Sequence, residues 1–63
     1  MPIVTVQMYK GRSVDQKRKL AHALTDAMVE HAGAKLANLI VVIEEVDEEN
    51  WAMAGMLGID ETK

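Results

Sequence analysis

The residue with the most unusual chemical potential is Pro2, which follows Met1 in the opening stretch "MPIVTVQMYKGRS". Inside a chain, proline has no N–H and is tolerated as the first residue of a strand. We expect Met1 to be removed, which would leave Pro2 as a free secondary amine. Such an amine is a base that no side chain can imitate. The residue therefore has two interpretations, a strand start and a catalytic base, and the remaining sequence must decide between them.

A secondary amine acts as a base near pH 7 only if it is neutral there. A simple secondary amine is largely protonated at that pH. An apolar pocket or a nearby cation disfavours the ammonium form and lowers its pKa. Lowering the pKa by ~2–3 requires ~3–4 kcal/mol from the environment. A base at Pro2 therefore needs an apolar wall or a cation beside it.

The length and composition predict a small domain that associates with copies of itself. A chain of 63 residues forms one domain, 1–63, and is only marginally stable alone. It has no cysteine, and His22 and His31 form no ligand cluster, so we expect neither disulfides nor a metal, and no cofactor. Oligomerisation is the remaining way to stabilise such a chain.

Charge and hydropathy limit the partners. The net charge is −3 and the basic residues form no stripe with aromatics, so nucleic acid is not an expected partner. No apolar run approaches the ~18 residues of a membrane span, and the first residues do not resemble a signal peptide. We therefore expect a cytoplasmic protein that acts on a small molecule.

The first half of the chain predicts a strand followed by a helix. Residues 3–8 are β-branched and apolar, and residues 10–12 form a turn. Ser13 and Gln16 make a capping box, which predicts a helix over 14–32 that ends at Gly33. Its apolar stripe is expected to contain Leu20, Leu24, Ala27, Met28 and His31. The polar positions expected to face outward are Lys17, Arg18, Lys19, Asp26 and Glu30, with His22 paired to Asp26.

The second predicted strand, 39–46, is apolar on both faces at its start. Glu44 and Glu45 are interpreted as surface charges at its end. A strand–helix–strand unit of this length predicts parallel pairing, and one helix covers only one face of the sheet. The fold class is therefore α/β, a single β-α-β protomer. "WAMAG" at 51–55 predicts a short hairpin or a loop laid on a neighbour. The uncovered face predicts association with other copies.

Together these motifs resemble the 4-oxalocrotonate tautomerase family. The resemblance rests on Pro2, "GRS" at 11–13, the "VVIEEV" strand and "NWAMAG", and it runs from Pro2 to about Leu57. It implies protomers that pair into four-stranded sheets and assemble further, commonly as hexamers. It also implies a cofactor-independent keto–enol tautomerase of small 2-hydroxydienoate or enol acids, with Pro2 as the shuttling base. Arg12 would bind the substrate carboxylate and Trp51 would form an apolar wall, and the residues of one site would come from different subunits.

One position departs from the family pattern. Many members carry a second arginine at the start of the second strand, beside the substrate, where this chain has Ile40. The missing arginine affects the prediction of the substrate more than the prediction of the reaction class. Two alternatives stay open. Protonated Pro2 could act as an acid in dehalogenation, hydration or decarboxylation, or the chain could be a non-enzymatic oligomeric binding module in which Pro2 is structural.

Overall fold

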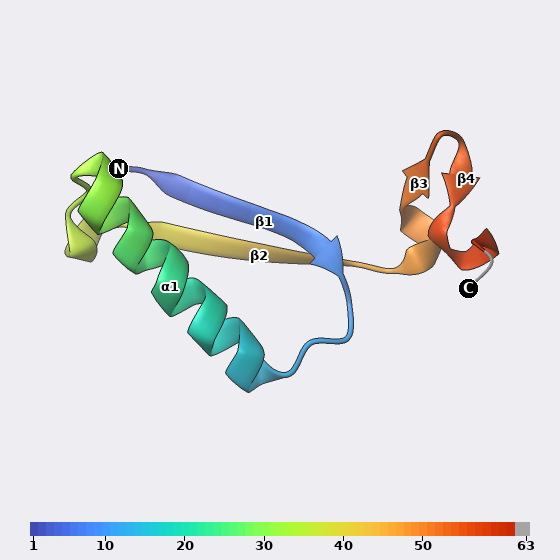
Figure 1. Cartoon of the computed structure of the whole chain (residues 1–63), viewed down its shortest axis with the longest axis horizontal. Coiled ribbons are helices and arrows are strands. Elements are labelled where there is room, and N and C mark those ends of the chain that lie inside the picture. Colours follow the sequence, from blue (N-terminus) through green and yellow to red (C-terminus); the bar gives the residue numbers. More distant parts are fainter. Residues whose placement is uncertain (62–63) are drawn as a thin grey trace.

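Two parallel strands form the centre of the protomer. The computed structural model describes residues 1–61. In it β1 (Ile3–Tyr9) pairs in parallel with β2 (Ile40–Val46), with Ile3 opposite Ile40 and Tyr9 opposite Val46. The helix α1 (Val14–Ala32) connects the strands and crosses one face of the sheet (Figure 1). The predicted β-α-β unit is confirmed. β2 begins one residue later than predicted, because Leu39 closes the short 3-10 turn Leu36–Asn38.

The bounds of α1 are set by local signals at both ends. The Ser13 hydroxyl accepts a hydrogen bond from the Gln16 backbone N–H at 3.1 Å, and the Gln16 side chain accepts one from the Ser13 N–H at 2.9 Å. This capping box satisfies two of the free N–H groups at the start of the helix. Gly33 ends the helix in the left-handed conformation. The helix predicted over 14–32 is therefore confirmed to the residue.

The sheet-facing side of α1 differs from the predicted stripe. Its half-buried residues are Lys17, Leu20, Ala21, Leu24, Thr25 and Met28. Ala27 and His31 are exposed, so their assignment to the stripe was wrong. The cause is geometric. The helix crosses the strands obliquely and its last turn extends past their start (Figure 1), and His31 belongs to that turn. Ala27 lies about 100° around the helix from Met28, which faces the sheet. Lys17, predicted to face outward, instead faces the sheet.

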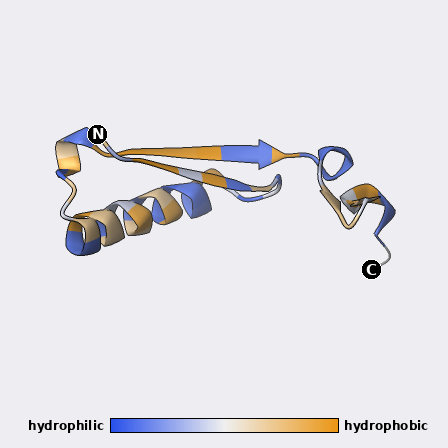
Figure 2. Cartoon of the chain, turned by 90° about the horizontal axis from the view of Figure 1, so that it is seen from above, coloured by the Kyte–Doolittle hydropathy of each residue, from blue (hydrophilic) through white to orange (hydrophobic). Residues whose placement is uncertain are grey.

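The other face of the sheet has no cover in the protomer. Ile3, Ile40 and Val42 are 61%, 43% and 38% exposed on it, and Figure 2 shows α1 lying on the opposite side. No hydrophobic side chain among residues 1–61 is fully buried. The radius of gyration is 14.7 Å, whereas a compact chain of this length would have about 11 Å. The protomer is thus an extended unit with an open apolar face, as the strand pattern predicted.

A small C-terminal unit extends beyond the end of β2 (Figure 1). A 3-10 turn (Glu48–Asn50) leads into β3 (Ala52–Met53) and β4 (Met56–Leu57), followed by a second turn (Gly58–Asp60). Ala54 and Gly55 join the strands with φ of 52° and 84°. Positive φ at both positions is the mark of a type I′ hairpin turn. Of the two predicted forms of this segment, the hairpin is therefore the one observed.

Candidate active site

Pro2 and Ile40 lie together at the start of the parallel strands. The Ile40 backbone N–H donates a hydrogen bond to the Pro2 carbonyl oxygen at 3.3 Å. Pro2 is half-buried, and Ile40 lies on the uncovered face of the sheet. The residue joined to Pro2 through the backbone therefore carries an apolar and partly exposed side chain.

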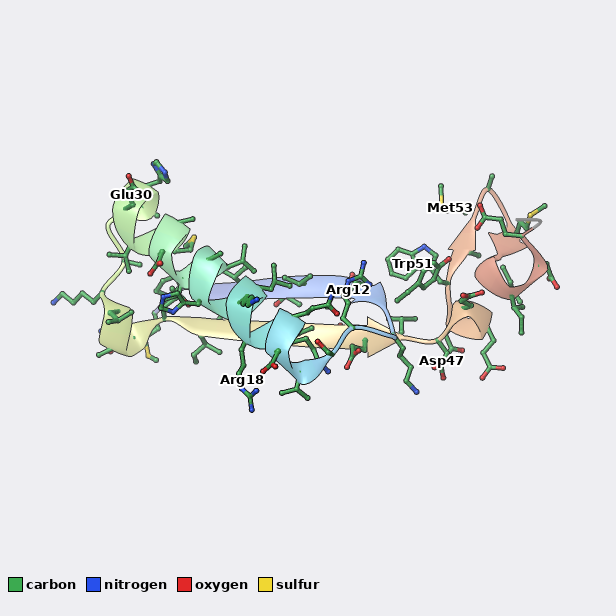
Figure 3. The ribbon with its side chains drawn as sticks, turned by 60° about the horizontal axis from the view of Figure 1, so that its bottom comes forward. Arg12, Arg18, Glu30, Asp47, Trp51 and Met53 are labelled. Atoms are coloured by element: carbon green, nitrogen blue, oxygen red, sulfur yellow. The ribbon has the colours of Figure 1, made fainter. Side chains whose placement is uncertain are left out.

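Arg12 and Trp51 lie at the opposite end of the sheet, and both contact Tyr9. Arg12 donates from Nη1 to the Tyr9 carbonyl oxygen at 3.2 Å. The Tyr9 and Trp51 rings are 5.3 Å apart between centroids and meet edge to face at 64°. Figure 3 shows Arg12 at the tip of the loop after β1 and Trp51 at the start of the C-terminal unit. Tyr9 thus contacts a cation through its carbonyl oxygen and an aromatic surface through its ring.

These two groups of residues do not meet within one protomer. β1 runs from Ile3 to Tyr9, and at about 3.3 Å per residue its ends are roughly 20 Å apart. A small acid cannot span that distance. Pro2 and Arg12 can act on the same substrate only if they come from different copies of the chain.

The loop that carries Arg12 is supported by an ion pair beneath α1. Lys17 Nζ lies 2.6 Å from Glu45 Oε1, and both side chains are about one-quarter exposed, at 27% and 26%. The Gly11 backbone N–H also donates to the Glu45 carboxylate. Gly11 has a φ of 126°, a conformation that L side chains rarely adopt. Glu45 therefore fixes the residue immediately before Arg12 relative to β2 and α1.

Sequence reasoning missed this support, although Glu45 is exposed as predicted. A signal was present. Alternation along β2 places Glu45 on the same face as Val41 and Ile43, beneath the helix, where a carboxylate needs a partner. Lys17, one turn before Leu20, is the cation in reach. Glu44 points to the other face, is exposed as predicted, and accepts a hydrogen bond from Gln7 Nε2 at 3.0 Å.

The ion pair predicts a stability difference that depends on pH. The hydrogen bond from Lys17 holds the pKa of Glu45 below its usual 4.5, against the opposing effect of burial. A carboxylate whose pKa is lowered on folding stabilises the fold above its unfolded pKa, and this contribution is lost as pH falls through the folded pKa. Glu45→Gln should therefore lower the melting temperature near pH 7, and its deficit should shrink below about pH 4.5.

Circular dichroism melts of the wild type and Glu45→Gln across that pH range measure the effect. Glu44→Gln is the matched control, because Glu44 faces away from the helix and has a neutral partner. A Glu45→Gln deficit that is independent of pH, or equal to that of Glu44→Gln, would contradict this role.

Other features lie away from both groups. A shallow hollow on the outer side of α1 is lined by Arg18, Lys19, His22, Ala23 and Asp26. The predicted pair is present there, with His22 Nε2 3.6 Å from Asp26 Oδ2. Within residues 1–61, no helix is long and apolar enough to cross a membrane, and no three His, Asp or Glu side chains gather as metal ligands.

The sequence and the fold both match known tautomerases. A family model described as "Tautomerase enzyme" matches residues 2–58. The 2-hydroxymuconate tautomerase of Bacillus subtilis (strain 168) is 44% identical over 55 residues, which cover 87% of this chain and 89% of the relative.

Two solved structures extend the comparison. YwhB, a homologue of 4-oxalocrotonate tautomerase, superposes with a TM-score of 0.93 at 39% identity, covering 97% of this chain and all of that one (100%). A heterohexameric 4-oxalocrotonate tautomerase from Chloroflexus aurantiacus J-10-fl gives a TM-score of 0.88 at 32% identity, over 95% of this chain and 97% of that one.

Proposed function

The chain belongs to the tautomerase enzyme family, and on that basis we propose that it is a cofactor-independent keto–enol tautomerase of small enol acids, such as 2-hydroxydienoates, with Pro2 as its base. The family match begins at residue 2. The observation that carries the proposal is that an arginine and an aromatic ring both contact Tyr9, at the far end of the strand that follows Pro2. The proposal includes removal of Met1.

The proposed reaction moves one proton and leaves the substrate formula unchanged. The neutral Pro2 amine accepts the proton of the enol hydroxyl. The oxygen electrons then form a carbonyl, and the conjugated double bonds shift toward a distant carbon. That carbon takes the proton back from the Pro2 ammonium, which regenerates the neutral amine. A single base that both accepts and returns the proton is sufficient for this chemistry.

Arg12 and Trp51 would hold the substrate during this transfer. The guanidinium of Arg12 suits a carboxylate, because its planar N–H groups can bind both oxygens. Trp51 offers an apolar surface to the conjugated chain, and exclusion of water strengthens the attraction between Arg12 and the carboxylate. Ile40 adds apolar surface beside Pro2, which disfavours the ammonium form of the amine.

The proposed site is shared between copies of the chain. The separation of about 20 Å between the ends of β1 supports a site that combines Pro2 of one protomer with Arg12 and Trp51 of another. The open face around Ile3, Ile40 and Val42 provides apolar surface for such contacts. We propose a dimer-based assembly, a hexamer by analogy with the heterohexameric relative.

Mixing two inactive variants tests the shared site. Pro2→Ala and Arg12→Ala proteins should each be nearly inactive alone on a small panel of enol acids. When they are unfolded together and refolded as a mixture, about a quarter of the sites in random assemblies should regain both residues from different chains. Activity should therefore return to roughly that fraction of the wild type.

Light scattering at low micromolar concentration accompanies this measurement and should show no folded monomer. The control is the same mixture made without unfolding, which keeps the two parent assemblies separate and should stay inactive. Absence of recovery in mixed assemblies of native size, or an active monomer, would contradict the shared site.

A further inference from the structure

Tyr9 has three contacts that the proposed reaction does not itself require. It is the last residue of β1, and its ring meets the Trp51 ring edge to face at 5.3 Å. Aromatic pairs prefer this geometry, and it restrains both rings beyond what burial alone would do. Because Trp51 follows directly after a short turn, this contact ties the start of the C-terminal unit to the end of the sheet.

The hydroxyl end of Tyr9 lies against the backbone of Gly58. A Cβ atom on residue 58 would overlap the Tyr9 hydroxyl oxygen and come within 3.1 Å of Cζ. Gly58 is also the one residue of 1–61 that is fully buried, and its N–H donates to the Trp51 carbonyl oxygen at 2.7 Å. Tyr9 and Gly58 therefore restrain Trp51 from two directions, through its ring and through its backbone.

The main chain of Tyr9 restrains the cation as well. Its carbonyl oxygen accepts the hydrogen bond from Arg12 Nη1 at 3.2 Å. One residue thus contacts both groups that are proposed to bind the substrate, and Figure 3 shows Arg12 and Trp51 on either side of the end of β1.

We propose that Tyr9 is a positioning residue that sets the orientation of Trp51 relative to Arg12, and that Gly58 is kept small so that the Tyr9 ring can occupy this place. The proposal rests on the proposed function for its consequence in substrate binding, but the coupling of the two rings can be measured without any substrate. Tyr9 touches no reacting atom in this scheme.

Comparing Tyr9→Leu with Tyr9→Phe separates the contribution of the Tyr9 ring from that of its hydroxyl group. Tyr9→Leu removes the ring, so Trp51 should lose its fixed orientation, and the near-ultraviolet circular dichroism of this single tryptophan should weaken. Because Trp51 would bind ground state and transition state alike, KM should rise about threefold to tenfold with kcat little changed. Tyr9→Phe keeps the ring and should stay within about twofold of the wild type in both constants.

Gly58→Ala tests the packing from the other side. In the wild-type background its methyl group should displace the Tyr9 ring and reproduce the spectrum and the KM of Tyr9→Leu. In the Tyr9→Leu background the same substitution should change the Trp51 spectrum little further, because the ring is already absent. The Glu48 carbonyl oxygen, 3.2 Å from the added Cβ in either background, needs to shift by only a few tenths of an ångström. Non-additivity of this kind is the signature of two residues that act through one contact. Light scattering on each variant checks that the assembly is intact.

Two results would overturn the proposal. One is an unchanged Trp51 spectrum in assembled Tyr9→Leu, and the other is a fully additive effect of Gly58→Ala on that spectrum. Failure of the proposed function looks different. If the wild type converts no enol acid, the kinetic constants cannot be compared. The circular dichroism spectra of the single and double variants still decide whether Tyr9 positions Trp51.

Discussion

Replacing Pro2 with alanine should lower kcat/KM for an enol acid by ~10²–10⁴, the range typical of a positioned general base. Alanine at the mature start still offers a primary amine, but that amine lacks the ring and lies differently relative to the substrate. The chain keeps its strand pairing, because the Ile40 N–H bonds the carbonyl of residue 2 and not its nitrogen. The loss should therefore fall on turnover with the assembly unchanged.

A second variant separates the amine from the ring. One extra residue left before Pro2 makes its nitrogen an amide, which is not basic, while the ring stays in place. This protein should lose activity as fully as Pro2→Ala. Intact-mass measurement of the wild type should show that Met1 is absent. Turnover equal to wild type in either variant, with native assembly, would remove Pro2 from the mechanism.

The pH dependence distinguishes a base from an acid at the same nitrogen. If neutral Pro2 accepts the proton, kcat/KM should fall as pH drops below the pKa of the free amine. If protonated Pro2 were the active form, as in the hydratase, dehalogenase or decarboxylase alternatives, kcat/KM should fall as pH rises above that pKa. A profile of the second kind would replace the tautomerase mechanism while keeping Pro2 as the catalytic residue.

Local signals predicted the elements well because each depends on only a few neighbouring residues. Ser13, Gln16 and Gly33 define both ends of α1 through contacts within one turn. The two-sided apolar pattern of β2 predicted an uncovered face. The pattern could not show that the helix crosses the sheet obliquely, with the last turn, which contains His31, beyond the start of the strands.

The site was less predictable because it depends on contacts between distant segments. Pro2 was singled out by its chemistry, and Arg12, Trp51 and Ile40 by resemblance. Nothing in their spacing shows that Tyr9 touches two of them. The ring contact between Tyr9 and Trp51 joins residues 42 positions apart, the end of β1 and the start of the C-terminal hairpin. Even so, a strand between Pro2 and Arg12 already implies that these residues lie at opposite ends of a sheet. The proposal that one site uses several copies of the chain therefore agrees with the order of these residues in the sequence.

Introducing a cation at residue 40 should change which substrates the protein prefers. Ile40 lies beside Pro2 through its backbone hydrogen bond to the Pro2 carbonyl, and its side chain is 43% exposed on the uncovered face. Arginine there would place a positive charge near the end of the substrate opposite Arg12. A preorganised donor that stabilises charge developing on oxygen is worth ~3–4 kcal/mol when removed from a site. The wild type lacks this contribution, so we expect Arg12 to be its main cationic contact.

Steady-state kinetics on one dicarboxylated dienol and one monocarboxylated enol test whether Arg12 is the main cationic contact and what a cation at residue 40 adds. Arg12→Ala should lower kcat/KM for both substrates by ~10²–10³, because each depends on that carboxylate contact. Ile40→Arg should raise kcat/KM for the dicarboxylate at least about tenfold relative to the monocarboxylate. Ile40→Gln, polar and of similar reach but uncharged, should leave the ratio unchanged.

The charge at residue 40 also acts on the Pro2 amine. Its effect on the pKa of that amine can be distinguished from its contact with the second carboxylate of the substrate. A nearby cation disfavours the Pro2 ammonium, whereas loss of the isoleucine surface favours it, so the pKa of the amine is pushed in opposite directions. Such a change alters both substrates alike, because both use the same base. Only direct contact with the second carboxylate alters their ratio. If Ile40→Arg assembles normally and the ratio stays at the wild-type value, or if Arg12→Ala leaves the dicarboxylate rate intact, Arg12 and residue 40 do not act on the two carboxylates as proposed.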